Sequence, residues 1–229
     1  MNTHLRAELL QLYADLRVAD VRDGMDVMGY HHTGSVSPVI RPLWRTRAVG
    51  IARTARYLPF AGRVPELGPE EYAAWSGRYY GEVCRYPWME TIEEGDFMVI
   101  DLSGVSAGLM GSENTLNALR RGIRGFVSSA GVRDTDEIIR QKVPFWSAAV
   151  AQSMVQGRLQ YDGHDVPIAV GGVTVCPGDV VVADGDGVIV VPSAIAKDVA
   201  LHAGAEHARD REARRRHYEA LGWDVDETV

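Results

Sequence analysis

A valine-rich segment near the end of the chain limits the possible folds more than any other part of the sequence. It contains three short runs rich in β-branched residues, at 173–175, 180–182 and 188–191. Such runs favour extended backbone, and the CPGD and DGDG sequences between them favour tight turns. DGDG also resembles part of a calcium loop, but strands flank it and Ile195 stands where that loop requires a glutamate. We therefore predict three strands, the last two joined by a hairpin turn.

Hydrophobic periodicity places the other elements. Helices are expected at 5–16, 18–28, 69–84, 114–121, 135–142 and 193–221, and further strands at 49–57, 97–101 and 125–128. Ser193 is the expected N-cap of the last helix, and Gly222 is its expected end. Because strands and helices mix without regular β-α-β alternation, we expect a single layered α/β domain over 1–229. An insert rich in aromatic residues, at about 59–90, is expected to form a lid or a subunit contact.

Composition and charge exclude several classes of protein. The sequence holds 24 basic and 31 acidic residues, a formal net charge of −7. This balance argues against binding to nucleic acid or to an anionic membrane, both of which need a basic surface. Two cysteines, Cys84 and Cys176, are too few for a disulfide framework. With no signal-peptide pattern and no apolar run long enough to span a membrane, a cytoplasmic location is expected.

Glycine is abundant, and part of it gathers in one run. The chain has 24 glycines, above the ~7% average, and Gly104, Gly108 and Gly111 lie between a predicted strand and a predicted helix. A turn in that place can direct backbone N–H groups at an anion. The run matches neither the G-x-G-x-x-G pattern nor the phosphate loop. The run is compatible with a site for a carboxylate, an enolate oxygen or a phosphate. It is also compatible with a bare turn.

The sequence Arg133-Asp134-Thr135-Asp136-Glu137 has two explanations. Three carboxylates are favoured in the first turn of a helix, where the helix dipole is positive. Alternatively, Asp134 binds a hard divalent cation while Arg133 holds a substrate carboxylate. Histidine spacing supports no zinc site, and no serine lies in a nucleophile elbow. Arginines alternating with acidic residues at 209–216 favour a solvated or subunit-facing helix.

Three motifs in a fixed order resemble a known family. They are Gly111 with Arg121-Gly122-x-x-Gly125, then Gly131-Val132-Arg133-Asp134, then the stretch from Pro177 to Pro192. The chain is similar to the family of the regulator of ribonuclease activity A and the 4-hydroxy-4-methyl-2-oxoglutarate/4-carboxy-4-hydroxy-2-oxoadipate aldolases, often labelled demethylmenaquinone methyltransferase-like. The similarity covers most of the chain. No glycine-rich adenosyl-binding loop supports the methyltransferase label.

The resemblance implies a layered β/β/α swivelling-type α/β fold with a long C-terminal helix. It also implies assembly as a homotrimer or a dimer of trimers, with sites between subunits. The implied activity is that of a class II, metal-dependent lyase that uses Mg²⁺ or Mn²⁺. Such an enzyme cleaves a 4-hydroxy-2-oxo acid to pyruvate by a retro-aldol reaction, or decarboxylates oxaloacetate through the same enolate.

The resemblance also implies roles for individual residues. By position, Asp134 is the metal ligand, and Arg133 binds the oxo acid and stabilises the developing enolate. A carboxylate from the last helix of a neighbouring subunit, Glu212 as first choice and Glu206 as second, supports a water on the cation that acts as the base. The pyruvyl carboxylate is held by the backbone at Gly108, Leu109, Met110 and Gly111.

Two departures from the family pattern leave the substrate and the proton relay open. Ser128-Ser129-Ala130-Gly131 stands where an Asp-Gly pair is usual, and Gly111-Ser112-Glu113-Asn114 replaces the usual Gly-Glu helix opening. A non-catalytic regulator that binds a ribonuclease or a helicase is one alternative function. A different reaction of a keto acid or enol on the same scaffold is another. Retention of Arg133 and Asp134 favours catalysis, since a binding module has no need for that pair.

Overall fold

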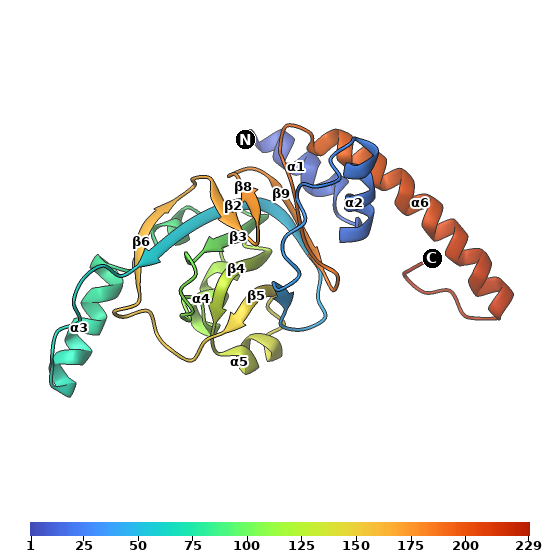
Figure 1. Ribbon diagram of the computed structural model, residues 1–229. Helices are drawn as coiled ribbons and strands as arrows, with labels where there is room; N and C mark the ends of the chain where they lie inside the picture. The colour runs from blue at the N-terminus through green and yellow to red at the C-terminus, as the bar shows by residue number, and fades with distance from the viewer.

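The strand predicted at 49–57 organises the sheet. In the computed structural model, which describes residues 1–229, it is β2 (Ala48–Pro59) and pairs with three other strands. The sheet has eight strands in the order β1-β5-β4-β3-β2-β9-β10, with β6 also paired to β2, and it curves into a nearly closed barrel (Figure 1). The other members are β1 (Arg41–Pro42), β3 (Asp96–Asp101), β4 (Gly125–Val132), β5 (Phe145–Val150), β6 (Leu159–His164), β9 (Val180–Asp184) and β10 (Gly187–Val191). This architecture confirms the predicted α/β fold class.

Four neighbouring strands of the sheet are parallel. β2 pairs parallel with β3, β3 with β4, and β4 with β5. Their carboxyl ends therefore lie along one edge, which is where α/β sheets place their ligand sites. Two short helices begin near this edge, α4 (Ser112–Leu119) after β3 and α5 (Thr135–Arg140) after β4. The glycine run and the Arg133-Asp134 pair are brought together by this topology.

The valine-rich segment forms strands as predicted. β9 and β10 are an antiparallel hairpin joined through Asp184 and Gly187, which confirms the hairpin turn. β8 (Val173–Val175) pairs instead with β7 (Ile168–Val170) in a separate two-stranded sheet. Strands β1, β5, β6 and β7 were not predicted: β1 and β7 have only two and three residues, β5 continues directly from a short turn, and β6 is largely polar.

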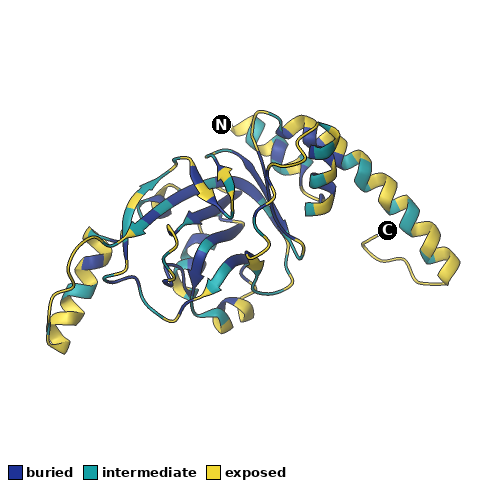
Figure 2. Cartoon of the chain, in the orientation of Figure 1, coloured by how far each residue is buried: buried dark blue, intermediate teal, exposed yellow.

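Three helices cover the β9–β10 side of the sheet: α1 (Thr3–Leu12), α2 (Val18–Val27) and α6 (Ala196–Leu221). Only the first part of α6 is buried, and its second half extends into solvent (Figure 2). It ends at Gly222, in the left-handed conformation with φ 67°, as predicted. Two predicted helix boundaries are wrong, and the strand predicted at 125–128 extends to Val132 as β4. The first helix ends at Leu12, and α6 begins after Ile195 because Ser193 belongs to the preceding turn, where its N–H donates to Asp179. No helix has the length and apolar character needed to cross a membrane.

The aromatic insert forms α3 (Pro69–Glu82) and a 3₁₀ helix, Pro87–Thr91. The predicted helix at 69–84 is thereby confirmed. α3 extends away from the barrel and is exposed over most of its surface (Figure 2). Buried aromatic side chains attach the insert to the sheet: Tyr79 donates a hydrogen bond to the Leu159 carbonyl (2.8 Å), and Trp88 donates to the Tyr57 hydroxyl (3.0 Å).

Candidate active site

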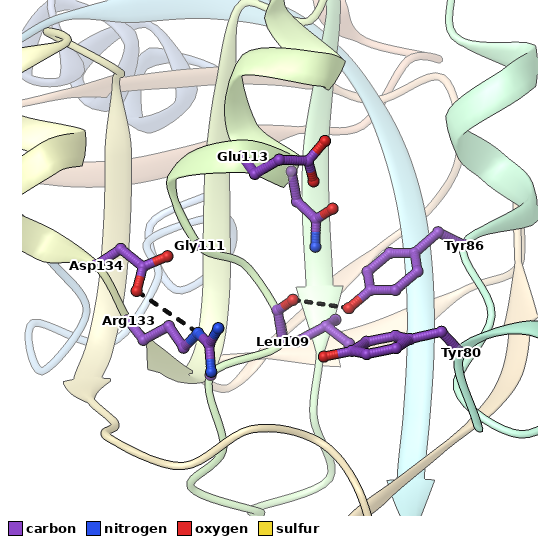
Figure 3. Close-up of a pocket in the computed structure, with 9 residues that line it drawn as sticks. Tyr80, Tyr86, Leu109, Gly111, Glu113, Arg133 and Asp134 are labelled. Atoms are coloured by element: carbon purple, nitrogen blue, oxygen red, sulfur yellow. Dashed lines mark hydrogen bonds and ion pairs between the residues drawn. The ribbon is translucent and has the colours of Figure 1, made fainter. Parts of the chain in front are cut away.

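A pocket of about 350 Å³ opens at the carboxyl edge of β3 and β4. Four segments line it, and Figure 3 shows how their side chains lie. They contribute Gly108, Leu109 and Gly111 from the loop after β3, Glu113 and Asn114 from α4, Arg133 and Asp134 from the junction of β4 and α5, and Tyr80 and Tyr86 from the aromatic insert. Most of the residues that the sequence singled out are therefore in one place.

Asp134 has an unusual backbone conformation. It precedes α5 with φ 54° and ψ 40°, in the left-handed region that residues with a side chain seldom adopt. Its side chain makes no capping bond to α5, and instead its Oδ2 accepts a hydrogen bond from the N–H of Ser112 at the start of α4 (3.1 Å). Asp136 and Glu137 lie in the first turn of α5 as the first explanation predicts, whereas Asp134 is at the N-cap position and directs its carboxylate to α4 instead. Residues held in such conformations cluster at functional sites.

Two glycines of the loop make room for the Arg133-Asp134 pair. A Cβ added to Gly111 would lie 2.3 Å from Oδ2 of Asp134, and a Cβ on Gly108 would lie 2.8 Å from the Arg133 side chain. Gly104 is different, since a Cβ there would meet nothing within 4 Å, and its φ of 78° makes it a turn residue. Gly104 is thus a turn residue, whereas Gly108 and Gly111 are positions where the loop approaches the Arg133 and Asp134 side chains closely.

The backbone of Arg133 is fixed, whereas its guanidinium faces the pocket. Its N–H donates to the carbonyl of Met110 (3.1 Å), whose side chain lies in the core and does not line the pocket. Nε of Arg133 lies 3.6 Å from Oδ1 of Asp134, and both side chains are about one third exposed. An ion pair this long and this exposed is weak. The guanidinium therefore keeps donors for an anionic ligand.

Part of the backbone that is predicted to hold the substrate carboxylate already donates hydrogen bonds within the protein. The N–H groups of Gly108 and Leu109 donate to the carbonyls of Ser153 and Ala107, each at 3.0 Å. Binding of a substrate carboxylate by this loop stays a prediction. The start of α4 also borders the pocket, and the dipole of a helix favours negative charge there.

Two tyrosines of the aromatic insert close the opposite side of the pocket. The Tyr86 hydroxyl donates to the Leu109 carbonyl (2.8 Å), and the Tyr86 ring stacks on Tyr80 with 6.3 Å between centroids and an interplanar angle of 28°. Burial raises the pKa of Tyr86 well above its ordinary value, so this hydroxyl stays protonated. The sequence predicted that this insert, Tyr80 included, forms a lid or a subunit contact. It did not single out Tyr86, because the contact of Tyr86 with Leu109 is made only in the folded chain.

The acidic groups of the pocket fit a magnesium-type cation. Asp134 and Glu113 are its carboxylates, and no group of three or more His, Cys, Asp or Glu side chains gathers anywhere in the chain. Zinc sites normally need three or four such ligands. Mg²⁺ needs only one or two carboxylates, because water and substrate oxygens complete its shell. Because Gly111 has no Cβ, the Asp134 carboxylate can lie directly against the loop that lines the pocket.

Glu212 and Glu206 lie elsewhere in this chain. Glu212 is exposed on the second half of α6, and Glu206 is partly buried near the middle of the helix, where it pairs with Arg209; both border a separate surface hollow. Neither lines the pocket. Their predicted role in a neighbouring subunit's site stays a prediction.

Sequence comparisons relate the chain to one protein family and to several named proteins. The model of the RraA-like family, described as Aldolase/RraA, matches residues 18–190. Protein DlpA of Legionella pneumophila is 27% identical over 187 residues, which are 81% of this chain and 28% of DlpA. The 4-hydroxy-4-methyl-2-oxoglutarate aldolase of Thermus thermophilus is 34% identical over 104 residues, which are 44% of this chain and 62% of that protein. The chain thus spans less than two thirds of the length of either relative.

A solved structure shares the fold. RraAS2 of Streptomyces coelicolor, an unusual member of the RNase ES inhibitor RraA protein family, aligns with a TM-score of 0.71 and 26% sequence identity. The alignment covers 90% of this chain and 96% of RraAS2. The barrel-like sheet and the helices described above are therefore those of a known fold.

Proposed function

The chain belongs to the RraA-like family, and from that premise we propose that it is a divalent-metal-dependent lyase of the aldolase type. Its substrate is a 4-hydroxy-2-oxo acid, which it cleaves to pyruvate and a second carbonyl compound, or oxaloacetate, which it decarboxylates. The observation that carries the proposal is the meeting of Arg133 and Asp134 in one pocket. The name of the Thermus thermophilus relative supports the aldolase activity.

Asp134 is the residue that holds the cation in this proposal. Its carboxylate is fixed by the N–H of Ser112 through Oδ2, and Oδ1 faces the weak ion pair with Arg133. A divalent cation bound there supplies Lewis acidity for the negative charge of the enolate. Glu113 lines the same pocket and adds a second carboxylate near the cation.

Arg133 binds the oxo acid. A guanidinium presents parallel N–H donors that match a carboxylate, and it stays protonated at any physiological pH. Its positive charge is already in place before the reaction, so it stabilises the charge that develops as the enolate forms. The fixed backbone of Arg133, paired with the Met110 carbonyl, maintains this orientation.

Cleavage breaks the C3–C4 bond and leaves its electron pair in the enolate of pyruvate. The C4 hydroxyl gives up its proton, C4 becomes a carbonyl carbon, and C3 later takes a proton to give pyruvate. A carboxylate must accept the hydroxyl proton directly or through water. Within this chain Glu113, which lines the pocket, is the candidate for this role, and Glu212 of a neighbouring copy is the candidate that the family resemblance implies.

The test is pyruvate release from a panel of 4-hydroxy-2-oxo acids and from oxaloacetate. We expect release with Mg²⁺ or Mn²⁺, its loss with EDTA, and its recovery when the metal is restored. Absence of activity on the whole panel, or activity that EDTA does not change, contradicts the proposal.

Paired variants identify the proton acceptor. If Glu113 accepts the proton, Glu113→Gln lowers kcat by at least about a hundredfold, whereas Glu212→Gln changes it little. The opposite result assigns the role to Glu212 in a neighbouring copy. Glu219→Gln, a third glutamate, on the exposed end of α6, is the control that leaves kcat unchanged.

The likeness to RraAS2 supports a second candidate, inhibition of an RNase E-type ribonuclease. A regulator of this kind acts through its surface and has no need for the charged residues of the pocket. Ribonuclease inhibition that persists in Arg133→Ala, without any pyruvate release by the wild-type protein, favours this candidate.

A further inference from the structure

The two sides of the pocket differ in chemistry. The charged wall consists of Glu113, Arg133 and Asp134, and the aromatic wall consists of Tyr80 and Tyr86. Figure 3 shows the Arg133-Asp134 pair on one side and the two tyrosines on the other. A ligand that fills the pocket must therefore satisfy charged groups at one end and aromatic rings at the other.

The net charge of the charged wall can balance one substrate carboxylate. Arg133 is the only basic side chain among the residues that line the pocket, beside the two carboxylates of Asp134 and Glu113. With a divalent cation bound, one guanidinium and two carboxylates leave a net charge of +1. That charge balances a single carboxylate, and a second one would lie without a cationic partner.

The aromatic wall is built to hold a ring. Tyr86 is anchored by its hydrogen bond to Leu109, so its hydroxyl is engaged and its ring stays in place. Tyr80 stacks against it and keeps about one third of its surface exposed. Neither residue offers a positive charge. The Tyr86 ring is packed among Tyr57, Tyr80 and Trp88, whereas the exposed part of Tyr80 offers π surface on which a flat apolar group stacks.

We propose that the preferred substrate is a 4-hydroxy-2-oxo monocarboxylate with an aromatic substituent at C4. This inference rests on the proposed lyase function and names the substrate class of the same site. The oxo acid end would meet Arg133 and a bound cation, while the C4 ring would stack on Tyr80, whose ring is supported from behind by Tyr86. A second carboxylate, such as the one on an oxoglutarate, would meet these rings and Glu113 instead.

The reaction on such a substrate needs no further reactant. The C3–C4 bond breaks, its electrons form the pyruvate enolate, and the C4 hydroxyl proton passes to the base. The released product is an aromatic aldehyde or ketone. Protonation of C3 then completes pyruvate.

Two unreactive ligands test the inference by binding alone. 4-Phenyl-2-oxobutanoate and 2-oxoglutarate share the oxo acid end and differ at C4, which carries a phenyl group in one and a carboxylate in the other. Neither has the C4 hydroxyl, so neither can undergo retro-aldol cleavage. In calorimetry with Mn²⁺ present, we expect the phenyl ligand to bind about tenfold more tightly.

The outcomes separate this inference from the function on which it rests. Tighter or equal binding of 2-oxoglutarate overturns the aromatic preference and leaves the lyase proposal standing. Failure of both ligands to bind in the presence of Mn²⁺ counts against an oxo acid site altogether, and both proposals then fall.

Variants of the aromatic wall give a second readout. Tyr80→Ala is expected to lower the ratio of phenyl to carboxylate ligand affinity about tenfold, and Tyr80→Phe is expected to retain it. Tyr72→Ala is the matched control, because Tyr72 is an exposed tyrosine on the same helix outside the pocket. An unchanged ratio in Tyr80→Ala, with the fold intact by circular dichroism, overturns the assignment.

Discussion

The charged wall and the aromatic wall of the pocket are made by different parts of the chain and are held in different ways. Arg133 and Asp134 follow directly from β4, a strand buried in the centre of the sheet; the backbone N–H of Arg133 pairs with the neighbouring loop, and the Asp134 carboxylate accepts from the N–H of Ser112. Tyr80 and Tyr86 belong to an insert whose helix α3 is largely exposed. Under the proposed function, the residues of the reaction are therefore held by the core, whereas the residues proposed to select the substrate belong to the insert.

The largest effect is expected at the charged wall. Asp134→Asn keeps a side-chain oxygen for the N–H of Ser112 but removes the charge that holds the cation. Metal-dependent pyruvate release should fall by about a thousandfold or more, because the Lewis acid contributes several kcal/mol. Steady-state kinetics on two substrates measures this, and the loss should be the same for both. Activity within tenfold of wild type would place the cation elsewhere.

Arg133→Lys tests the guanidinium of the charged wall. Lysine keeps the charge but loses the forked donors, so kcat/KM is expected to fall about a hundredfold. Arg140→Lys is the matched control, an exposed arginine at the end of α5, and should behave as wild type. Equal activity of both variants would mean that only charge matters at position 133.

Gly111→Ala tests how closely the loop approaches the charged wall. The added Cβ would lie 2.3 Å from Oδ2 of Asp134, so the carboxylate must move. A displaced ligand should lower metal-dependent activity by about tenfold or more. Gly204→Ala, in the open middle of α6, adds the same methyl group without a contact within 4 Å and should leave activity unchanged. Wild-type metal affinity in Gly111→Ala would contradict the importance of this approach.

The smallest effect is expected at the hydrogen bond that attaches the aromatic wall to the loop after β3. Tyr86→Phe removes the donor to the Leu109 carbonyl and keeps the ring, so the free energy of unfolding should fall by about 1 kcal/mol. Urea denaturation measures this. Tyr80→Phe is the control, because the Tyr80 hydroxyl makes no hydrogen bond within the chain. If Tyr86→Phe is as stable as wild type, the hydrogen bond does not attach the aromatic wall to the loop.

Local sequence patterns singled out Arg133 and Asp134, and the family resemblance implied their roles, whereas Glu113 was assigned no role from the sequence. Asp134 and Arg133 are adjacent in sequence, and the glycines that make room for them lie in a recognisable strand–loop–helix segment. The valine runs and their turns likewise identified β8, β9 and β10. In these regions the signal is local, so periodicity and turn chemistry are sufficient.

The remaining features depend on contacts between distant segments. The stack of Tyr80 on Tyr86 and the bond from Tyr86 to Leu109 join the insert to a loop that the chain reaches only later. The left-handed backbone of Asp134 was also not predicted, since aspartate at a helix start usually signals a cap. Here its carboxylate instead caps another helix, α4, a choice made by tertiary structure.

Binding of oxalate tests the central claim most directly, because oxalate resembles the enolate of pyruvate in shape and charge. Calorimetric titrations of the wild-type protein would be compared with and without Mn²⁺, and repeated with Asp134→Asn. The account predicts that oxalate binds the wild-type protein only when Mn²⁺ is present and that Asp134→Asn abolishes this binding. Oxalate binding that is independent of the metal, or unchanged in Asp134→Asn, would contradict it.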